Sequence, residues 1–338
     1  MKKHFLFLSM FALTSALSYG QQVATTGSAP TPVTCPDNDP LNPIIGKEYT
    51  YKGTGSPTGG TYHIFATNST NFIQNGALVT TGAYTTGNQI TTTDASYNVG
   101  TNNNGEVKLA WTGAAANPSF VAIQYKTPTG ACTTDNLKVY KITPKNAFTI
   151  ELRNMENAGG TFTTKTTNVD VCSANVQSAT YNTGTDRIEY DYGKQSFYYE
   201  LIAANYDKTF EAKFKLSGLQ TGQSAKLKWG TDKTAITNDL GNIISDGAEV
   251  TVTVTADSNV TPSAGVSIYL ELEVTNGTYE GTTDKPITLS ADATTGANNL
   301  KDVKTDCSDE DDFADKAIQT LKARPAIAPN TGTQFIGS

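Results

Sequence analysis

Histidine is almost missing from this chain, because only two of its 338 residues are histidine and His63 is the only one beyond residue 4. Nucleophilic catalysis near neutral pH usually needs a histidine base beside the nucleophile. The sequence has no G-x-S-x-G, H-E-x-x-H or phosphate-binding glycine motif, and His63 sits in an expected strand between Tyr62 and Ile64. The sequence therefore predicts no catalytic residue, no cofactor and no enzyme activity.

Charged side chains are also scarce, at 17% of the chain, and the formal net charge is −7. Nucleic-acid binding relies on clustered lysine and arginine, and no such cluster occurs, so a nucleic-acid partner is excluded. Acidic and tyrosine residues do occur together between Asp170 and Glu200. Two carboxylates are enough for glycoside hydrolysis, but 32 acidic residues in the chain make such neighbours common.

Long apolar runs are absent except for Phe5 to Leu17, which follows Lys2 and Lys3 and ends before Ser18 and Gly20. The run is shorter than the roughly 20 residues that a membrane-spanning helix needs. Its basic start and small closing residues predict a signal peptide over residues 1–20 and export from the cytoplasm. Residues 21–34, rich in threonine, alanine and proline, are expected to form a flexible leader.

The chain has four cysteines: Cys35, Cys132, Cys172 and Cys307. An even number in an oxidising compartment predicts two disulfides, although four cysteines allow three pairings. Their positions favour Cys35 with Cys132 and Cys172 with Cys307, because each pair brackets one strand-rich half. A cysteine metal site is disfavoured, since no C-x-x-C spacing occurs.

Short segments of alternating apolar and polar residues fill both halves of the chain, separated by turn-forming clusters, as in β-sandwiches. In the first half the expected strands are 48–52, 60–66, 88–92, 106–111, 119–126 and 137–142. In the second half, one-sided apolar rows start at Phe210, Val250 and Ile268, and Asn276-Gly277 predicts a hairpin turn. We expect an all-β protein with sandwiches over residues 35–145 and 146–325 and a polar tail over 326–338.

Two surfaces are candidates for binding. Tyr198 and Tyr199 could form an aromatic platform for sugars, although an inward-packed strand is the favoured interpretation. The segment from Ala317 to Arg324, with Ile318 and Leu321, is expected to be the closing strand that ends at Pro325. At a sheet edge it could accept a partner's strand.

No metal is predicted, although Asp306, Asp309, Asp311 and Asp312 form a weak calcium candidate. Calcium prefers several oxygen ligands, but this loop lacks the alternation and the glycine of a calcium-binding loop. A solvated acidic connection is the favoured interpretation.

Trp111, the run from Phe120 to Tyr125 and the run from Cys132 to Pro144 resemble PKD-like, immunoglobulin-like modules. These modules occur in exported envelope proteins of Bacteroidota that carry gliding-motility and type IX secretion systems. The resemblance implies an adhesion, spacing or assembly role without chemistry. The final residues, from Gln334 to Ser338, lack the lysine-containing strand of the commonest type IX sorting domain, which favours the periplasm or the outer membrane over the cell surface.

The function expected from the sequence is therefore structural. The chain would support a surface adhesin, gliding-motility or secretion apparatus by contacts with envelope or outer-membrane proteins. The alternative is a carbohydrate-binding module that holds polysaccharide at the cell surface.

Overall fold

The computed structural model describes residues 39–56, 58–128, 134–206, 209–243, 246–255, 266–296, 299–304 and 306–327. The predicted signal peptide, the leader, the end of the tail, Cys35 and Cys132 lie outside these residues. Every regular element in the described ranges is a β-strand, as expected for an all-β protein. No helix in these ranges is long and apolar enough to cross a membrane.

The amino-terminal sandwich consists of two three-stranded antiparallel sheets. One sheet has the order β1 (Glu48–Lys52), β6 (Glu106–Trp111), β5 (Ile90–Thr91), and the other has the order β2 (Thr61–Thr67), β7 (Ser119–Lys126), β8 (Asp135–Ile142). A small hairpin, β3 (Ile73–Gln74) and β4 (Ala77–Leu78), stands apart from both sheets.

The core of this sandwich forms around Trp111, whose side chain is fully buried. Its indole N–H donates a 2.7 Å hydrogen bond to the hydroxyl of Tyr51. Val107 and Leu109, on the same strand as Trp111, point into the same core. The alternation in this strand is thus the side-chain period of a sheet with one buried face.

The carboxyl-terminal sandwich is larger and pairs a six-stranded sheet with a five-stranded sheet. The six-stranded sheet has the order β10 (Thr161–Lys165), β9 (Thr149–Ala158), β14 (Lys194–Ala204), β19 (Val266–Thr275), β16 (Ser224–Gly230), β17 (Asn238–Ile243). The five-stranded sheet has the order β11 (Val169–Val171), β21 (Asp315–Leu321), β20 (Lys285–Thr295), β15 (Thr209–Ser217), β18 (Glu249–Thr255).

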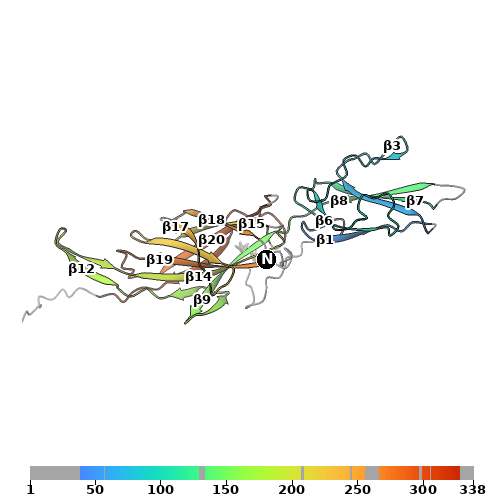
Figure 1. The fold of residues 1–338 in the computed structure, drawn as a ribbon. Helices are drawn as coiled ribbons and strands as arrows, with labels where there is room; N and C mark the ends of the chain where they lie inside the picture. The colour runs from blue at the N-terminus through green and yellow to red at the C-terminus, as the bar shows by residue number, and fades with distance from the viewer. Residues whose placement is uncertain are drawn as a thin grey trace, which may run out of the picture.

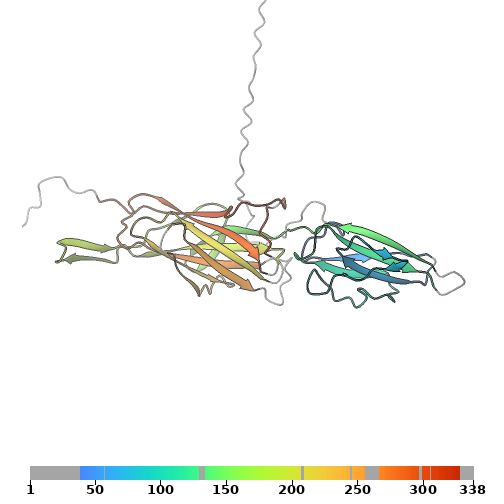
Figure 2. The same cartoon turned by 90° about the horizontal axis from the view of Figure 1, so that it is seen from above.

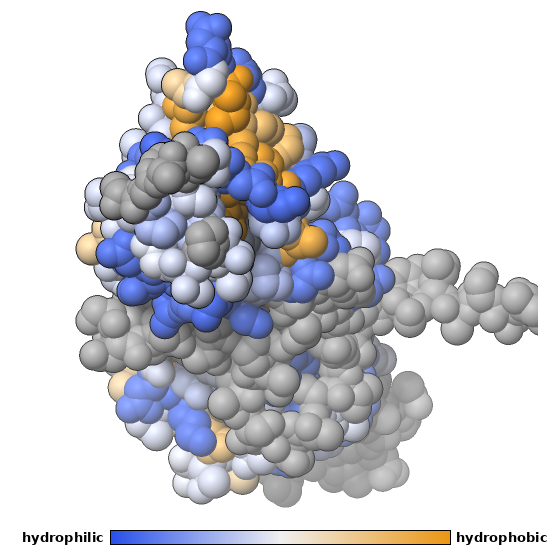
Figure 3. Space-filling model, turned by 90° about the vertical axis from the view of Figure 1, so that its right-hand side faces the viewer, coloured by the Kyte–Doolittle hydropathy of each residue, from blue (hydrophilic) through white to orange (hydrophobic). Residues whose placement is uncertain are grey.

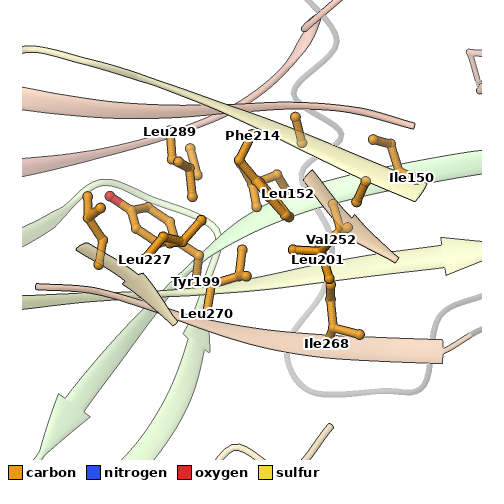
Figure 4. Packing of buried hydrophobic residues seen from close by; sticks show 14 of the residues in the cluster. Ile150, Leu152, Tyr199, Leu201, Phe214, Leu227, Val252, Ile268, Leu270 and Leu289 are labelled. Atoms are coloured by element: carbon orange, nitrogen blue, oxygen red, sulfur yellow. The ribbon is translucent and has the colours of Figure 1, made fainter. Parts of the chain in front are cut away.

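One hydrophobic core fills the space between these two sheets (Figure 4). The predicted apolar rows supply it, because Phe210, Ala212, Phe214 and Leu216 on β15, and Ile268, Leu270, Leu272 and Val274 on β19, are all fully buried. Burial of such rows on both inner faces is the main stabilising contribution in a sandwich.

Two expectations about connections and edges are wrong. The chain does not turn back into a hairpin at Asn276-Gly277, because β19 and β20 belong to different sheets. The closing strand β21 is not an edge either. It pairs antiparallel with β20 on one side and parallel with β11 on the other, so the short strand β11 occupies that edge.

The two sandwiches lie end to end, and the molecule is elongated (Figures 1 and 2). At the junction, Ile44 bridges to Lys145, and the N–H of Gly46 donates to the carbonyl oxygen of Trp111 at 2.7 Å. A hairpin of β12 (Ser178–Asn182) and β13 (Arg187–Asp191) projects from the far end of the carboxyl-terminal sandwich, away from the amino-terminal one.

Candidate functional site

The projecting hairpin, residues 178–191, is the candidate interaction site, and we call it the ribbon. Its two strands pair only with each other. Asn182 begins the tight turn, and its side-chain oxygen accepts hydrogen bonds from the N–H groups of Gly184 and Thr185. A two-stranded ribbon has two faces, and neither face of this one is covered by another sheet.

The two faces of the ribbon differ in chemistry. Tyr181 lies opposite Ile188, and Ala179 lies opposite Tyr190, so these four side chains share one face. Ser178, Thr180, Asn182, Arg187, Glu189 and Asp191 share the other face. The ribbon therefore has an apolar face and a polar face.

The apolar face is open to solvent. Tyr181 is 53% exposed, Ile188 is 48% exposed and Tyr190 is 45% exposed. An isolated two-stranded hairpin is marginally stable at best in water. The contacts that stabilise the ribbon must therefore come from outside its own two strands. A contiguous exposed apolar surface is the usual mark of an interaction site.

The root of the ribbon is held firmly to the carboxyl-terminal sandwich. Tyr192 stacks on Tyr190 with ring centroids 5.6 Å apart, and the guanidinium of Arg324 lies over the ring of Tyr192, 5.1 Å from its centroid. Arg324 also donates hydrogen bonds to the carbonyl oxygens of Ala174 and Tyr192. This contact at the root limits rotation of the ribbon about its base.

Asn276 completes the root from inside the sandwich. Its side chain is 1% exposed and donates to the carbonyl oxygen of Tyr192 at 3.0 Å and to the side-chain oxygen of Gln195 at 2.7 Å. It accepts from the side-chain nitrogens of Gln195 and Gln223. The Asn-Gly pair expected to form a hairpin turn is thus a buried polar junction under the ribbon.

A second apolar surface lies on the amino-terminal sandwich. In Figure 3 it appears near the top of the view, where the β3–β4 hairpin stands in Figure 1. Ile73 is 42% exposed there, and the half-buried Phe72 packs edge-on against Phe120 with ring centroids 5.2 Å apart. This hairpin is short, with two residues in each strand.

The predicted aromatic platform is not formed. Tyr199 is fully buried among Leu227, Leu270 and Leu289 (Figure 4), and burial raises the pKa of its hydroxyl. Tyr198 is half-buried, packs edge-on against Phe162 and donates to a carboxylate oxygen of Glu271 at 3.4 Å. Strand β14 therefore packs Tyr199 inward, as the favoured interpretation expected, whereas Tyr198 lies on its outer face.

The other predicted binding residues are also not exposed at an edge. Leu321 is 2% exposed and belongs to the core. Ile318 is half-buried, and its carbonyl oxygen accepts a 2.9 Å hydrogen bond from the side chain of Asn154. The proposed strand addition at β21 is wrong, because β11 already occupies that position.

His63 has a structural environment. Its Nε2 lies 2.8 Å from the side-chain oxygen of Asn98, and its ring packs edge-on against Phe65. No serine, threonine or cysteine nucleophile is bonded to His63 among the described residues. The geometry at this histidine gives it no catalytic partner in that part of the chain.

Cys172 is an exposed free cysteine, so the predicted disulfide between Cys172 and Cys307 is wrong. Strand β11 ends one residue earlier, at Val171, in parallel pairing with Leu321, and this position keeps Cys172 on the surface. Because Cys35 and Cys132 lie outside the described residues, a bridge between them is not tested.

The predicted calcium loop does not gather its four carboxylates. Asp306, Asp309, Asp311 and Asp312 are all exposed. Asp306 bonds with Ser308, which lowers the pKa of its carboxyl, and Lys301 pairs with Asp312 and does the same there. Asp306 and Asp312 are thus each held by a separate partner at the surface.

The sequence contains a signal for the ribbon, which is a pair of short alternating segments around a turn. Ala179 and Tyr181, then Ile188 and Tyr190, alternate on either side of Asn182-Thr183-Gly184-Thr185-Asp186, a typical turn sequence. Tyr190 lies close to Tyr198 in the sequence but on a different strand, because β12 and β13 separate from the sandwich at this point.

No protein-family model and no curated protein matches this chain. Solved structures that resemble it include the N-terminal domain of PorA, at 12% identity over 52% of this chain and 96% of that one, with a TM-score of 0.24. The full-length major pilin SpaD from Corynebacterium diphtheriae matches at 13% identity over 88% of this chain and 62% of its own, with a TM-score of 0.26. A collagen adhesin from S. aureus matches at 9% identity over 83% of this chain and 89% of its own, with a TM-score of 0.21. At TM-scores this low, the likenesses decide nothing about function.

Proposed function

We propose that this chain is an exported, non-catalytic protein of the bacterial cell envelope that works by holding a partner protein. The observation that carries the proposal is the ribbon, which presents three large, exposed apolar side chains on one face at the end of an elongated molecule. Its root is fixed by Arg324 and Asn276, so the face is presented in one orientation. A fixed aromatic surface of this kind suits protein recognition.

The finer parts of the proposal rest on the sequence. They are the domains over residues 35–145 and 146–325, export by the signal over residues 1–20, and a place in the periplasm or outer membrane or at the cell surface. The resemblance of residues 111–144 to PKD-like modules supports a partner from an adhesion, gliding-motility or secretion apparatus.

The test is capture of partners from detergent-solubilised envelopes. The mature chain is compared with the triple variant Tyr181→Ser, Ile188→Ser, Tyr190→Ser. We expect the variant to lose the captured partner by at least about tenfold, because central aromatic contacts dominate binding energy. The matched control, Ser178→Ala with Thr180→Ala, alters the polar face of the same strand and should bind like the original chain.

Salt separates apolar from charge-driven recognition. Capture through the apolar face should persist at about 0.5 M salt, where interactions between surface charges are largely screened. Complete loss of the partner at that salt, or equal binding by the triple variant, would contradict the proposal. Specific binding of the same chain to a glycan array, lost in the triple variant, would instead favour the carbohydrate-binding alternative.

A further inference from the structure

Three carboxylates meet at one end of the carboxyl-terminal sandwich, on the side of the junction. Asp302, Glu310 and Asp315 each place one oxygen within 4.8 Å of the other two. Asp315 begins β21 opposite Ala291 of β20, and Asp302 lies after β20, where its carboxylate accepts a 2.9 Å hydrogen bond from the N–H of Ala293. We call these three residues the carboxylate cluster.

The cluster is buried. Asp302 is 4% exposed and Asp315 is 6% exposed, whereas Glu310 is half-buried. One carboxylate oxygen of Asp315 is inaccessible to solvent and has no hydrogen-bond partner. Leaving a buried carboxylate oxygen without a partner costs free energy, and such groups in proteins are normally paired or bound to a metal.

Nearby lysines balance the negative charge of the cluster only in part. Among the described residues, none of the three carboxylates forms an ion pair with lysine or arginine. Asp292 and Glu151 add negative charge nearby, whereas Lys304 opposes it at Glu310 and Lys301 opposes it at Asp302. Burial, reinforced by the neighbouring carboxylates, raises the pKa of Asp302 to about 7 and raises that of Asp315 well above its usual range.

We infer that the carboxylate cluster is a binding site for a calcium ion. Calcium takes six to eight oxygen ligands at about 2.3 to 2.6 Å, so ligands on opposite sides of it lie about 5 Å apart, which suits the spacing of this cluster. Three carboxylates would supply the charge, and backbone carbonyl groups and water would complete the shell. Magnesium fits less well, because it keeps several waters and is reluctant to enter a buried site.

The site differs from the four exposed aspartates predicted from the sequence. Those residues occupy the same connection between β20 and β21, but only Glu310 of that acidic run reaches the cluster. Its partners come from either side of the run, at Asp302 and at the start of β21.

The location gives the ion a structural task. The connection that carries the ligands contacts the start of the carboxyl-terminal sandwich, where the N–H of Val303 donates to the carbonyl oxygen of Phe148 at 2.8 Å. The side chain of Asn146 donates to the carbonyl oxygen of Lys301 at 2.6 Å. An ion that fixes this connection also stiffens the junction between the two sandwiches.

The test is calcium titration of the purified chain after treatment with a chelator, followed by thermal unfolding and calorimetry. With calcium at about 100 times the dissociation constant, the melting temperature of the carboxyl-terminal sandwich should rise by about 5 °C or more. Asp315→Asn should abolish the heat of binding and the shift. The matched control Asp311→Asn, an exposed acid in the same connection, should keep both.

If Asp315→Asn does not fold, Glu310→Gln takes its place, because Glu310 is half-buried and more tolerant of change. The inference would be overturned if millimolar calcium left the original chain unchanged. Equal shifts in the original chain and in the folded cluster variant would also overturn it. An equal effect of magnesium would overturn the assignment to calcium.

Discussion

Asp302 has a carboxyl whose pKa moves in the direction opposite to that of a paired surface carboxyl. Its burial, with Asp292 and Glu310 close by, raises the pKa from 3.8 to about 7. Between these two pH values the folded chain binds more protons than the unfolded chain, so the free energy of unfolding falls as pH rises. The stabilising contribution is complete below about pH 4 and is lost as pH passes through about 7.

The expected result is that the chain without divalent cations unfolds at a lower temperature at pH 8 than at pH 5. Thermal unfolding in a chelator at a series of pH values measures this. Asp302→Asn should flatten the profile, because the variant side chain does not titrate. A melting temperature that rises from pH 5 to pH 8 in the original chain would show that other groups dominate.

Cys172 also yields a prediction at the scale of single residues. With Cys172 free, three cysteines remain, so one chain can form one disulfide among them at most. Cys307 packs against Ile44 and Ala147 at the junction. Cys35 precedes Ile44 by only nine residues in the sequence, and so we expect Cys35 to pair with Cys307.

Native alkylation should label Cys172, and peptide mapping without reduction should recover Cys35 linked to Cys307. Loss of this bridge on reduction should lower the free energy of unfolding by about 2 to 5 kcal/mol. Recovery of Cys35 linked to Cys132 would refute the pairing. Protection of Cys172 from alkylation in the folded chain would contradict its exposure.

Among the strands, Asn276 at the end of β19 forms hydrogen bonds with residues at the starts of β14 and β16 and at the root of the ribbon. Asn276→Ala would leave the carbonyl oxygen of Tyr192 and the side chains of Gln195 and Gln223 with fewer partners in a buried site. We expect the free energy of unfolding to fall by about 2 to 3 kcal/mol. Chemical denaturation measures the change, and Asn88→Ala, at an exposed asparagine, serves as the control. A change as small as that of the control would mean that water replaces the side chain without cost.

Periodicity predicted individual strands well. The expected strands 48–52, 106–111 and 119–126 have the same ends as β1, β6 and β7. In β1 and β6 one face is buried and the alternation reports that burial directly, whereas β7 is buried on both faces. The apolar rows on β15 and β19 were predicted correctly for the same reason. These features depend only on local sequence.

The pairing between strands could not be predicted in the same way. Asn276-Gly277 has the composition of a hairpin turn, yet the backbone there crosses to the other sheet, and Gly277 with φ of 55° fits either course. The position of β11 beside β21 joins residues far apart in the chain. The carboxylate cluster depends on the same long-range arrangement, so composition pointed to its acidic connection but not to its buried members.

The carboxyl-terminal sandwich and part of the amino-terminal one separate the ribbon from the β3–β4 hairpin (Figure 1). Under the proposed function, the two exposed apolar surfaces would contact different partners, and the elongated chain would act as a spacer between them. The distance that the molecule spans depends on the junction, and the carboxylate cluster lies next to that junction.

The parallel pairing of β11 with β21 also determines how the molecule bears mechanical load. Tension applied between the amino-terminal sandwich and Arg324 would run along β21. The backbone hydrogen bonds that join β21 to β20 and β11 lie across that direction. Bonds on both sides of the strand must then break together by sliding, whereas a strand peeled from an edge breaks them one at a time. The strand next to the ribbon's root is thus built to resist pulling by whatever the ribbon holds.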